Sequence, residues 1–256
     1  DVILTDDNFT TIVSAVEEGR RIYDNIIKVI LYLLSANIGE IVALFVVTVG
    51  APLIAKWFGI VDVTMVEILL PIQILWINLV TDSLPALALS FDPANKDVMK
   101  KKPIESKKGI FTPGMTYRMI YQGILIGIIT IAAFLIGIAT TNEAIDGHSL
   151  EQTKIEVGQT MAFIVLSFAE LVHIFNVRDN KRSIFAGGLF NNSKLWLANL
   201  ASGGLMLIIL LIPGLRAMFS IPVLPAGNIL EIILLVLTPI VVVELFKLLK
   251  INTIKE

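Results

Sequence analysis

Six long apolar segments dominate the pattern of hydrophobic and polar positions along the chain. Ahead of them, residues 1–18 mix charged with apolar positions. That stretch predicts a short strand over residues 2–4, a turn at residues 6–8, and an amphipathic helix capped by Thr10 or Thr11. Each apolar segment is near the ~20 residues that an α-helix needs to cross a bilayer. We therefore expect an all-α membrane protein, a bundle of six transmembrane helices over residues 26–49, 68–90, 119–140, 157–177, 195–215 and 229–245.

The composition supports a membrane environment. Hydrophobic residues make up 55% of the 256 positions, charged residues only 16%, and the mean hydropathy is +0.82. An ordinary soluble domain has roughly 45–50% apolar and about 25% charged residues. This balance excludes a soluble enzyme, a nucleic-acid binder and a disordered tail, and it makes the lipid bilayer a partner. The chain has no cysteine, which excludes disulfides, thiolate metal ligands and cysteine nucleophiles.

Basic residues are distributed unequally between the two sides of the predicted bundle. Seventeen of the 20 lysines and arginines lie in the flanks and in the loops around residues 91–118 and 178–194. The opposite side holds only Lys56, Lys154 and Arg216. Because basic residues concentrate in cytoplasmic loops, we expect a multi-pass integral membrane protein with both termini in the cytoplasm.

Three carboxylates lie inside the apolar segments. Glu40, Asp82 and Glu170 each lie near the middle of a predicted span, or just past it. An ionised side chain at the bilayer centre costs about 2.5–3.5 kcal/mol, so three of them need compensation. No lysine or arginine occurs within residues 29–55, 57–95 or 155–177. The three carboxylates must therefore be protonated or share a cation.

Neighbouring oxygen-bearing side chains favour a cation. Asn37 lies three residues before Glu40, which places both on one helix face. Asn78, Thr81 and Asp82 are spaced so that they also share one face. Oxygen ligands of this number and kind suit calcium, which takes 6–8 oxygens in flexible geometry.

A proline adds to the irregularity of the second span. Pro85 has no N–H with which to bond the carbonyl oxygen of Thr81, so that oxygen is released at the depth of the polar side chains. Irregular backbone at membrane depth is tolerated where it lines an ion site. A soft-metal site is disfavoured by the absence of cysteine.

Each of these residues also has a structural alternative. Glu170 is separate from the main cluster and is consistent with a protonated group that bonds a neighbouring helix. Asn37 and Asn78 are also typical of polar contacts between membrane helices. Pro85 is also consistent with a simple kink. His173, one turn after Glu170, is better interpreted as a packing residue than as a ligand.

Two membrane motifs resemble a known family. Residues 35–40 (SANIGE) and 75–86 (LWINLVTDSLPA) are similar to the fifth and sixth membrane helices of calcium-transporting P-type ATPases, of the sarco/endoplasmic-reticulum type and its bacterial counterparts. Residues 4–9 (LTDDNF) and 15–20 (AVEEGR) resemble the exit from that family's phosphorylation domain.

The resemblance implies a division of the chain into two parts. Residues 1–20 correspond to the C-terminal edge of a soluble α/β phosphorylation domain and its stalk, and residues 21–256 to a six-helix transmembrane cation-transport domain, helices five to ten of the family.

The resemblance also implies the roles of six residues. Asp82 would bridge two calcium sites, and Asn78 would contribute to the second of them. The remainder of that second site belongs to a fourth helix with a Pro-Glu-Gly-Leu motif, which this chain does not contain. The first site would be formed by Asn37, Glu40, Thr81, Asp82 and Glu170.

The function implied is the ion-binding part of an ATP-driven pump that exports Ca²⁺ from the cytoplasm, with proton countertransport. ATP and Mg²⁺ would be bound by upstream domains of the parent protein: the actuator, nucleotide-binding and phosphorylation domains and the first four membrane helices. The Asp-Lys-Thr-Gly-Thr and Thr-Gly-Glu-Ser motifs of those domains are absent here, so this chain alone should not be catalytic. With no initiator methionine and no signal peptide, it is interpreted as a segment of a longer protein, in the plasma membrane if bacterial. The alternatives are a pump of the same superfamily for Mn²⁺, Na⁺ or H⁺, and a passive six-span channel or exchanger.

Overall fold

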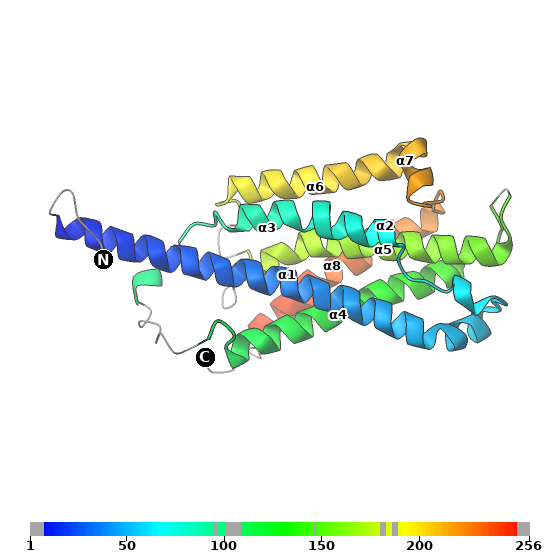
Figure 1. Cartoon of the computed structure of the whole chain (residues 1–256), viewed down its shortest axis with the longest axis horizontal. Coiled ribbons are helices and arrows are strands. Elements are labelled where there is room, and N and C mark those ends of the chain that lie inside the picture. Colours follow the sequence, from blue (N-terminus) through cyan, green and yellow to red (C-terminus); the bar gives the residue numbers. More distant parts are fainter. Residues whose placement is uncertain are drawn as a thin grey trace.

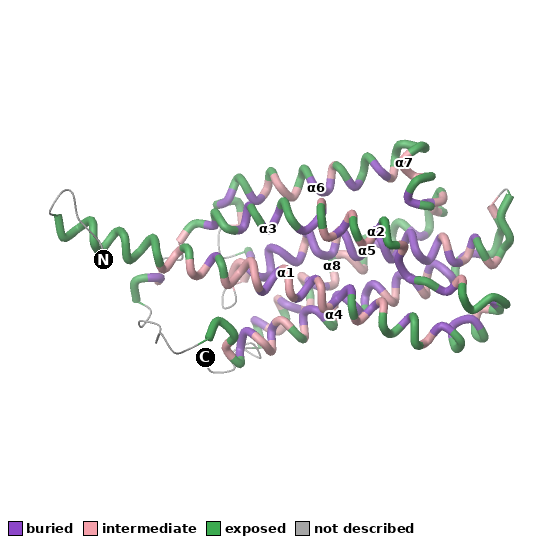
Figure 2. The backbone as a smooth tube through the Cα atoms, viewed as in Figure 1, coloured by how far each residue is buried: buried purple, intermediate pink, exposed green. Residues whose placement is uncertain are grey.

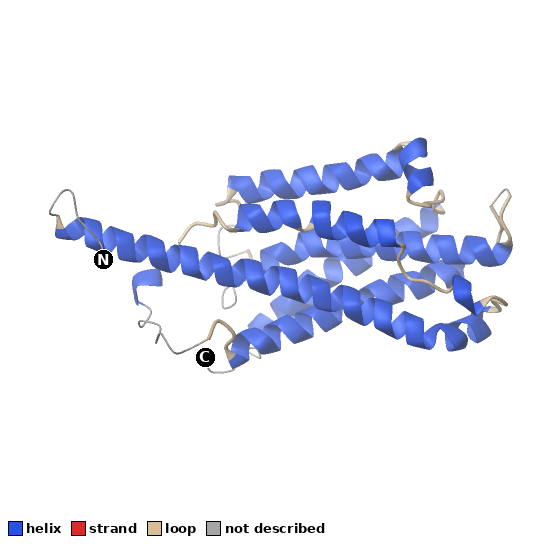
Figure 3. Ribbon diagram, viewed as in Figure 1, coloured by secondary structure: helices blue, strands red, loops and turns tan. Residues whose placement is uncertain are grey.

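The protein is a bundle of long helices, seen along its full length in Figure 1. The computed structural model describes residues 8–94, 97–100, 109–145, 147–179, 183–185 and 189–249. These residues form helices joined by loops and contain no strand, as Figure 3 shows. Six helical stretches are long and apolar enough to cross a membrane, which confirms the predicted all-α bundle. The strand expected at residues 2–4 lies outside the described residues.

The first helix, α1 (Phe9–Phe58), is the longest in the described structure, with 50 residues. Its N-cap is Asn8, whose side chain accepts a hydrogen bond from the backbone N–H of Thr10, so the predicted cap at Thr10 or Thr11 was wrong. At 1.5 Å per residue α1 measures about 75 Å, much more than the ~30 Å of a bilayer core. The predicted amphipathic helix is therefore the start of α1, and it projects beyond the bundle in Figure 1. The helix ends at Gly59, where φ is 68°.

The second membrane span is not one regular helix. It consists of α2 (Pro71–Trp76), a π-helical turn, η2 (Ile77–Thr81), and α3 (Ser83–Leu89). In the π-helical turn the N–H of Asp82 bonds the carbonyl oxygen of Ile77, five residues earlier, at 3.0 Å. π-Helical turns are rare, and they occur mostly as single turns inside α-helices, frequently at functional sites.

The remaining spans follow the predicted segments, with one difference. The predicted fifth span, residues 195–215, is interrupted by Pro213, which begins a separate short helix. Proline cannot continue the hydrogen bonds of a helix interior but fits the first helical position. The helices are α4 (Pro113–Thr140), α5 (Leu150–Arg178), α6 (Ser193–Leu211), α7 (Pro213–Met218) and α8 (Ala226–Leu248). Short 3₁₀ turns lie at η1 (Val63–Met65) and η3 (Val98–Lys100).

Helix α5 is the centre of the bundle. Its most apolar stretch is 89% buried, whereas that of α8 is only 11% buried. Figure 2 shows the buried residues of α5 along the helix. Helix α1 packs on α4, α4 packs on α5, and α5 packs on α8. A polar residue on α5 is therefore held against its neighbours and away from lipid.

The contact between α1 and α4 is unusually close, because glycines face it from both helices. A Cβ atom built on Gly39 would lie 3.2 Å from the carbonyl oxygen of Gly123, and one on Gly127 would lie 3.0 Å from that of Gly39. Small residues of this kind let membrane helices approach closely. The approach places the middle of α1, with Glu40, deep in the bundle.

Candidate cation site

Helix α1 supplies Asn37 and Glu40. Glu40 follows a glycine in a largely apolar stretch. It is only 5% exposed, so its carboxyl group lies inside the bundle. Asn37 is half-buried, and its amide donates to the carbonyl oxygen of Leu33 at 2.8 Å. Within the described residues, the structure gives no hydrogen bond between Asn37 and another predicted ligand.

The π-helical turn supplies Asn78, which faces Glu40. Its amide nitrogen lies 3.0 Å from each carboxyl oxygen of Glu40 and also donates to the carbonyl oxygen of Ile74 at 3.1 Å. The hydroxyl of Ser83 donates to the carbonyl oxygen of Asn78 at 3.0 Å, which satisfies one carbonyl that the irregular turn releases. In this arrangement Asn78 presents hydrogen-bond donors to Glu40, and an amide would have to present its oxygen to bind a cation.

Thr81 and Asp82 lie at the end of the same turn and are almost completely buried. Asp82 Oδ1 accepts a hydrogen bond of 3.0 Å from the hydroxyl of Tyr32 on α1. The hydroxyl of Thr81 is buried and makes no hydrogen bond within the described residues. Because Pro85 has no N–H, it cannot donate to the carbonyl oxygen of Thr81, as predicted from the sequence. The hydroxyl of Thr81 is therefore a buried oxygen beside Asp82 that is available to a ligand.

Glu170, on α5, is fully buried. Neither of its oxygens meets a conventional hydrogen-bond donor within the described residues. Its carboxyl group lies close enough to those of Asp82 and Glu40 to interact with both. The three carboxylates predicted from the sequence therefore come from α1, the π-helical turn and α5, and face one interior region.

The carboxylates converge without forming a complete cation cage. Among the described residues, no three histidine, aspartate or glutamate side chains are close enough to hold a metal ion as they stand. An ion held jointly by Glu40, Asp82 and Glu170 would require these side chains to move closer together, and Asn78 to turn its oxygen toward it.

His173 links the helices around these groups. Its Nε2 lies 3.0 Å from the hydroxyl of Ser35 on α1. Its ring is stacked near that of Tyr32, with 6.3 Å between the ring centroids. This position agrees with the interpretation of His173 as a packing residue between α5 and α1.

Comparison with known proteins identifies the family. The family described as "Cation transporting ATPase, C-terminus" matches residues 66–249 of this chain. The chain belongs to this family. The match covers the π-helical turn and Glu170, and so includes the helices that carry two of the three carboxylates.

Full-length relatives match most of the chain. A protein of Bacillus cereus named calcium-transporting ATPase 1 is 41% identical over 98% of this chain and 27% of its own length. A calcium-transporting ATPase of Bacillus subtilis is 40% identical over 89% of this chain and 23% of its own length. An endoplasmic reticulum calcium ATPase of Aspergillus fumigatus is 34% identical over 86% of this chain and 24% of its own length. The chain thus spans about a quarter of the length of these curated relatives.

Sequence reasoning missed Tyr32 as a neighbour of the buried carboxylates in this member of the family. Tyr32 lies eight residues before Glu40, close to two turns earlier on nearly the same helix face. A polar aromatic residue at that position of an apolar span was the available indication. Which helix it would meet depended on the packing of α1 beside the π-helical turn.

Proposed function

We propose that this chain is the ion-binding membrane part of an ATP-driven pump that exports Ca²⁺ from the cytoplasm. The observation that carries the proposal is the convergence of Glu40, Asp82 and Glu170 in the buried interior of the bundle. No lysine or arginine occurs in the sequence of the surrounding spans, at residues 29–55, 57–95 and 155–177. Carboxylates at membrane depth without basic partners mark an ion or proton pathway.

Calcium is the cation that the donors suit best. The candidate ligands offer carboxylate, amide, hydroxyl and carbonyl oxygens, the hard donors that calcium prefers in sets of 6–8. The irregular backbone at the π-helical turn provides the flexibility that such a site tolerates. The names of the bacterial and fungal relatives point to the same ion. As ligands we propose Asn37, Glu40, Asn78, Thr81, Asp82 and Glu170.

Transport requires that the site exist in at least two states. When a cation leaves, the three carboxylates are brought close together with no countercharge, and their mutual repulsion favours uptake of protons. This is the physical basis on which we propose proton countertransport.

Helix α1 is the element that would transmit the energy of ATP hydrolysis. We propose that residues 1–20 belong to the edge of a phosphorylation domain and its stalk, and that residues 21–256 form the transport domain. Because α1 runs without interruption from Phe9 to Phe58, a movement at its start is carried to Glu40. Domains of the parent protein would bind ATP and Mg²⁺, so this chain alone would not be catalytic.

The proposed location is a membrane with both chain ends in the cytoplasm, which is the plasma membrane in a bacterium. The start of α1 and the end of α8 lie at the same end of the bundle in Figure 1. Three basic residues lie together: Lys28 and Arg178 both pair with Asp92, and the ammonium group of Lys194 lies over the ring of Phe91. The concentration of basic residues supports this orientation.

The test is phosphoenzyme formation by the full-length parent protein. Membranes containing it are incubated with labelled ATP and calcium, manganese, sodium or a chelator, then quenched with acid. We expect acid-stable label with calcium, its absence with chelator, and its loss in Glu40→Gln and Asp82→Asn. Glu143→Gln, an exposed carboxylate in the loop after α4, is the matched control and should keep the label.

The other outcomes separate the alternatives. Label driven by manganese or sodium would show the right superfamily and a different cation. Ion flux through this chain alone in liposomes, without ATP, would indicate a passive channel or exchanger. Normal calcium-dependent label in Asp82→Asn would refute the assignment of the site.

A further inference from the structure

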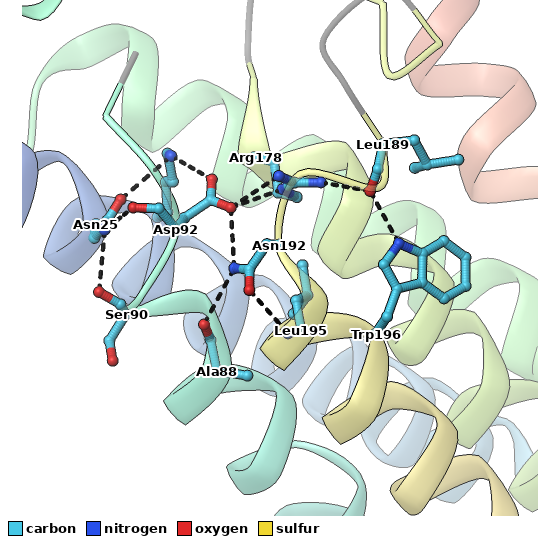
Figure 4. A network of polar contacts seen from close by, with 10 residues as sticks. Asn25, Ala88, Ser90, Asp92, Arg178, Leu189, Asn192, Leu195 and Trp196 are labelled. Carbon is cyan, nitrogen blue, oxygen red and sulfur yellow. Dashed lines mark hydrogen bonds and ion pairs between the residues drawn. The ribbon is translucent and has the colours of Figure 1, made fainter.

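Asp92, in the segment after α3, is a buried carboxylate outside the proposed cation site. Its side chain is 5% exposed and is bonded by three other side chains. Oδ2 accepts from the Lys28 ammonium at 2.7 Å. Oδ1 accepts from the Arg178 guanidinium at 2.9 and 3.0 Å and from the amide of Asn192 at 3.1 Å. Figure 4 shows these groups converging on one carboxylate.

Backbone contacts reinforce the same junction. The amide of Asn25 on α1 donates to the carbonyl oxygens of Ser90, at 3.0 Å, and Asp92, at 2.8 Å. The carbonyl oxygen of Leu189 accepts from Arg178 at 3.0 Å and from the indole N–H of Trp196 at 2.9 Å. We call Asn25, Lys28, Asp92, Arg178 and Asn192 the Asp92 node.

The node joins the helices that carry the proposed cation ligands. Lys28 lies 12 residues before Glu40 on α1, Asp92 lies 10 residues after Asp82, and Arg178 lies eight residues after Glu170 on α5. At 1.5 Å per helical residue these intervals are about 18, 15 and 12 Å. The node thus lies at a comparable distance from each of the three carboxylates and fixes the axial positions of their helices relative to one another.

Because of the charges in the Asp92 node, loss of the Asp92 carboxylate should disturb the node more than loss of any one basic residue. Two basic side chains, Lys28 and Arg178, are 16% and 11% exposed, and both bond the one carboxylate of Asp92. Removing one basic group leaves the other ion pair in place. Removing the carboxylate leaves two poorly solvated cations facing each other, and an unpaired buried charge is strongly destabilising. The helices would then separate locally to let water reach these cations.

We propose that Asp92 is a positioning residue for cation binding. It is ten residues from Asp82 and is bonded to basic and amide groups, so it binds no transported ion itself. It holds α1, α3 and α5 at the relative heights where Glu40, Asp82 and Glu170 converge. The inference rests on the proposed function, because it concerns the affinity of that same site.

The experiment measures how the full-length parent protein responds to the concentration of calcium. Phosphoenzyme formed from labelled ATP is titrated with calcium, together with equilibrium binding of radioactive calcium without ATP. In Asp92→Asn we expect the half-saturating calcium concentration to rise roughly 3- to 30-fold, the usual range for residues coupled to a distant site. The maximal label per folded protein should stay near the wild-type value. Asp92→Glu, which keeps the charge, should recover most of the affinity.

Two further variants distinguish positioning from general stability. In a Lys28→Met background, Asp92→Asn should raise the half-saturating concentration by a smaller factor, because the two residues act through one ion pair. Glu244→Gln is the matched control. Glu244 is another half-buried carboxylate and is paired with Lys247 on the same helix, α8, which carries no proposed ligand. It also accepts a hydrogen bond from the backbone N–H of Ile184, but it joins none of the helices that carry the proposed ligands. Its calcium response should be unchanged.

Each result has a defined meaning. An unchanged calcium response of folded Asp92→Asn, or an effect that is the same with and without Lys28, overturns the inference while leaving the proposed function intact. Loss of folded protein with normal affinity in the remainder also overturns it, since the role is then only structural. A wild-type protein that neither binds calcium nor forms label overturns the proposed function and the inference with it.

Discussion

The close contact between α1 and α4 gives a sharp test of the structure. We predict that Gly123→Ala, on α4, displaces α1. A Cβ atom at this position would lie 2.6 Å from Ile38 Cγ2 and 2.8 Å from the carbonyl oxygen of Ser35. Carbon atoms in good contact lie about 3.5–4.0 Å apart, so the two helices have to separate by about 1 Å. The Ser35 oxygen belongs to the backbone, so a change of side-chain rotamer cannot relieve the clash.

The expected magnitude follows from this displacement. Overpacking of a tight contact typically costs about 1–3 kcal/mol. A shift of about 1 Å in α1 also disturbs the 3.0 Å hydrogen bonds between Asn78 and Glu40, which weaken steeply outside normal geometry. We therefore expect lower thermal stability of the full-length protein in detergent, and a higher half-saturating calcium concentration.

The control is Gly204→Ala on α6, where an added Cβ meets no atom within 4 Å. That variant removes a glycine from another membrane helix without a clash, and it should be as stable as the wild type or slightly more so. If Gly123→Ala unfolds at the same temperature as Gly204→Ala, the close approach of α1 and α4 is incorrect.

Three further predictions concern the neighbours of the carboxylates. Pro85→Ala restores an N–H that can bond the carbonyl oxygen of Thr81, so calcium affinity should fall although the helix itself becomes more regular; an unchanged titration would mean that this oxygen is no ligand. Tyr32→Phe removes the hydroxyl that donates to Asp82, a bond worth about 1 kcal/mol, and should change calcium affinity about fivefold without loss of folded protein. Ser35→Ala removes the partner of the histidine on α5 and should lower the thermal midpoint by an amount equivalent to about 1 kcal/mol. Calcium affinity should be unchanged in Ser35→Ala if His173 serves only in packing.

The sequence by itself determined the class of the protein and the chemistry of its interior. Length and hydropathy are enough to identify membrane spans, because a helix must satisfy its own backbone in lipid and needs about 20 apolar residues to do so. The same rule makes Glu40, Asp82 and Glu170 conspicuous, since a charge in a span is expensive wherever the helix packs. All six spans and the burial of these three carboxylates agree with the structure.

The exact ends and interruptions of the helices were harder to predict from the sequence. The N-cap of α1 depends on which of several adjacent polar residues has an extended backbone. That residue is Asn8, with φ −103° and ψ 118°, and the threonines already lie within the helix. Pro85 indicated an irregular second span, but the irregularity itself begins at Ile77, eight residues before it, which is about two helical turns. Pro213 at the end of the fifth span was visible in the sequence, although hydropathy alone continued across it.

Only the tertiary structure decided which side chains meet. The bond between Asn78 and Glu40, and that between Tyr32 and Asp82, depend on the rotation and height of α1 beside the π-helical turn. The Asp92 node joins residues far apart in the sequence: Lys28 and Asn192, 164 positions apart, bond the same carboxylate. Hydropathy specifies how deep each residue lies in the membrane, because depth follows from position along one helix. It leaves open the contacts between helices, because these depend on side-chain packing, and lipid is as apolar as the side chains that compete with it.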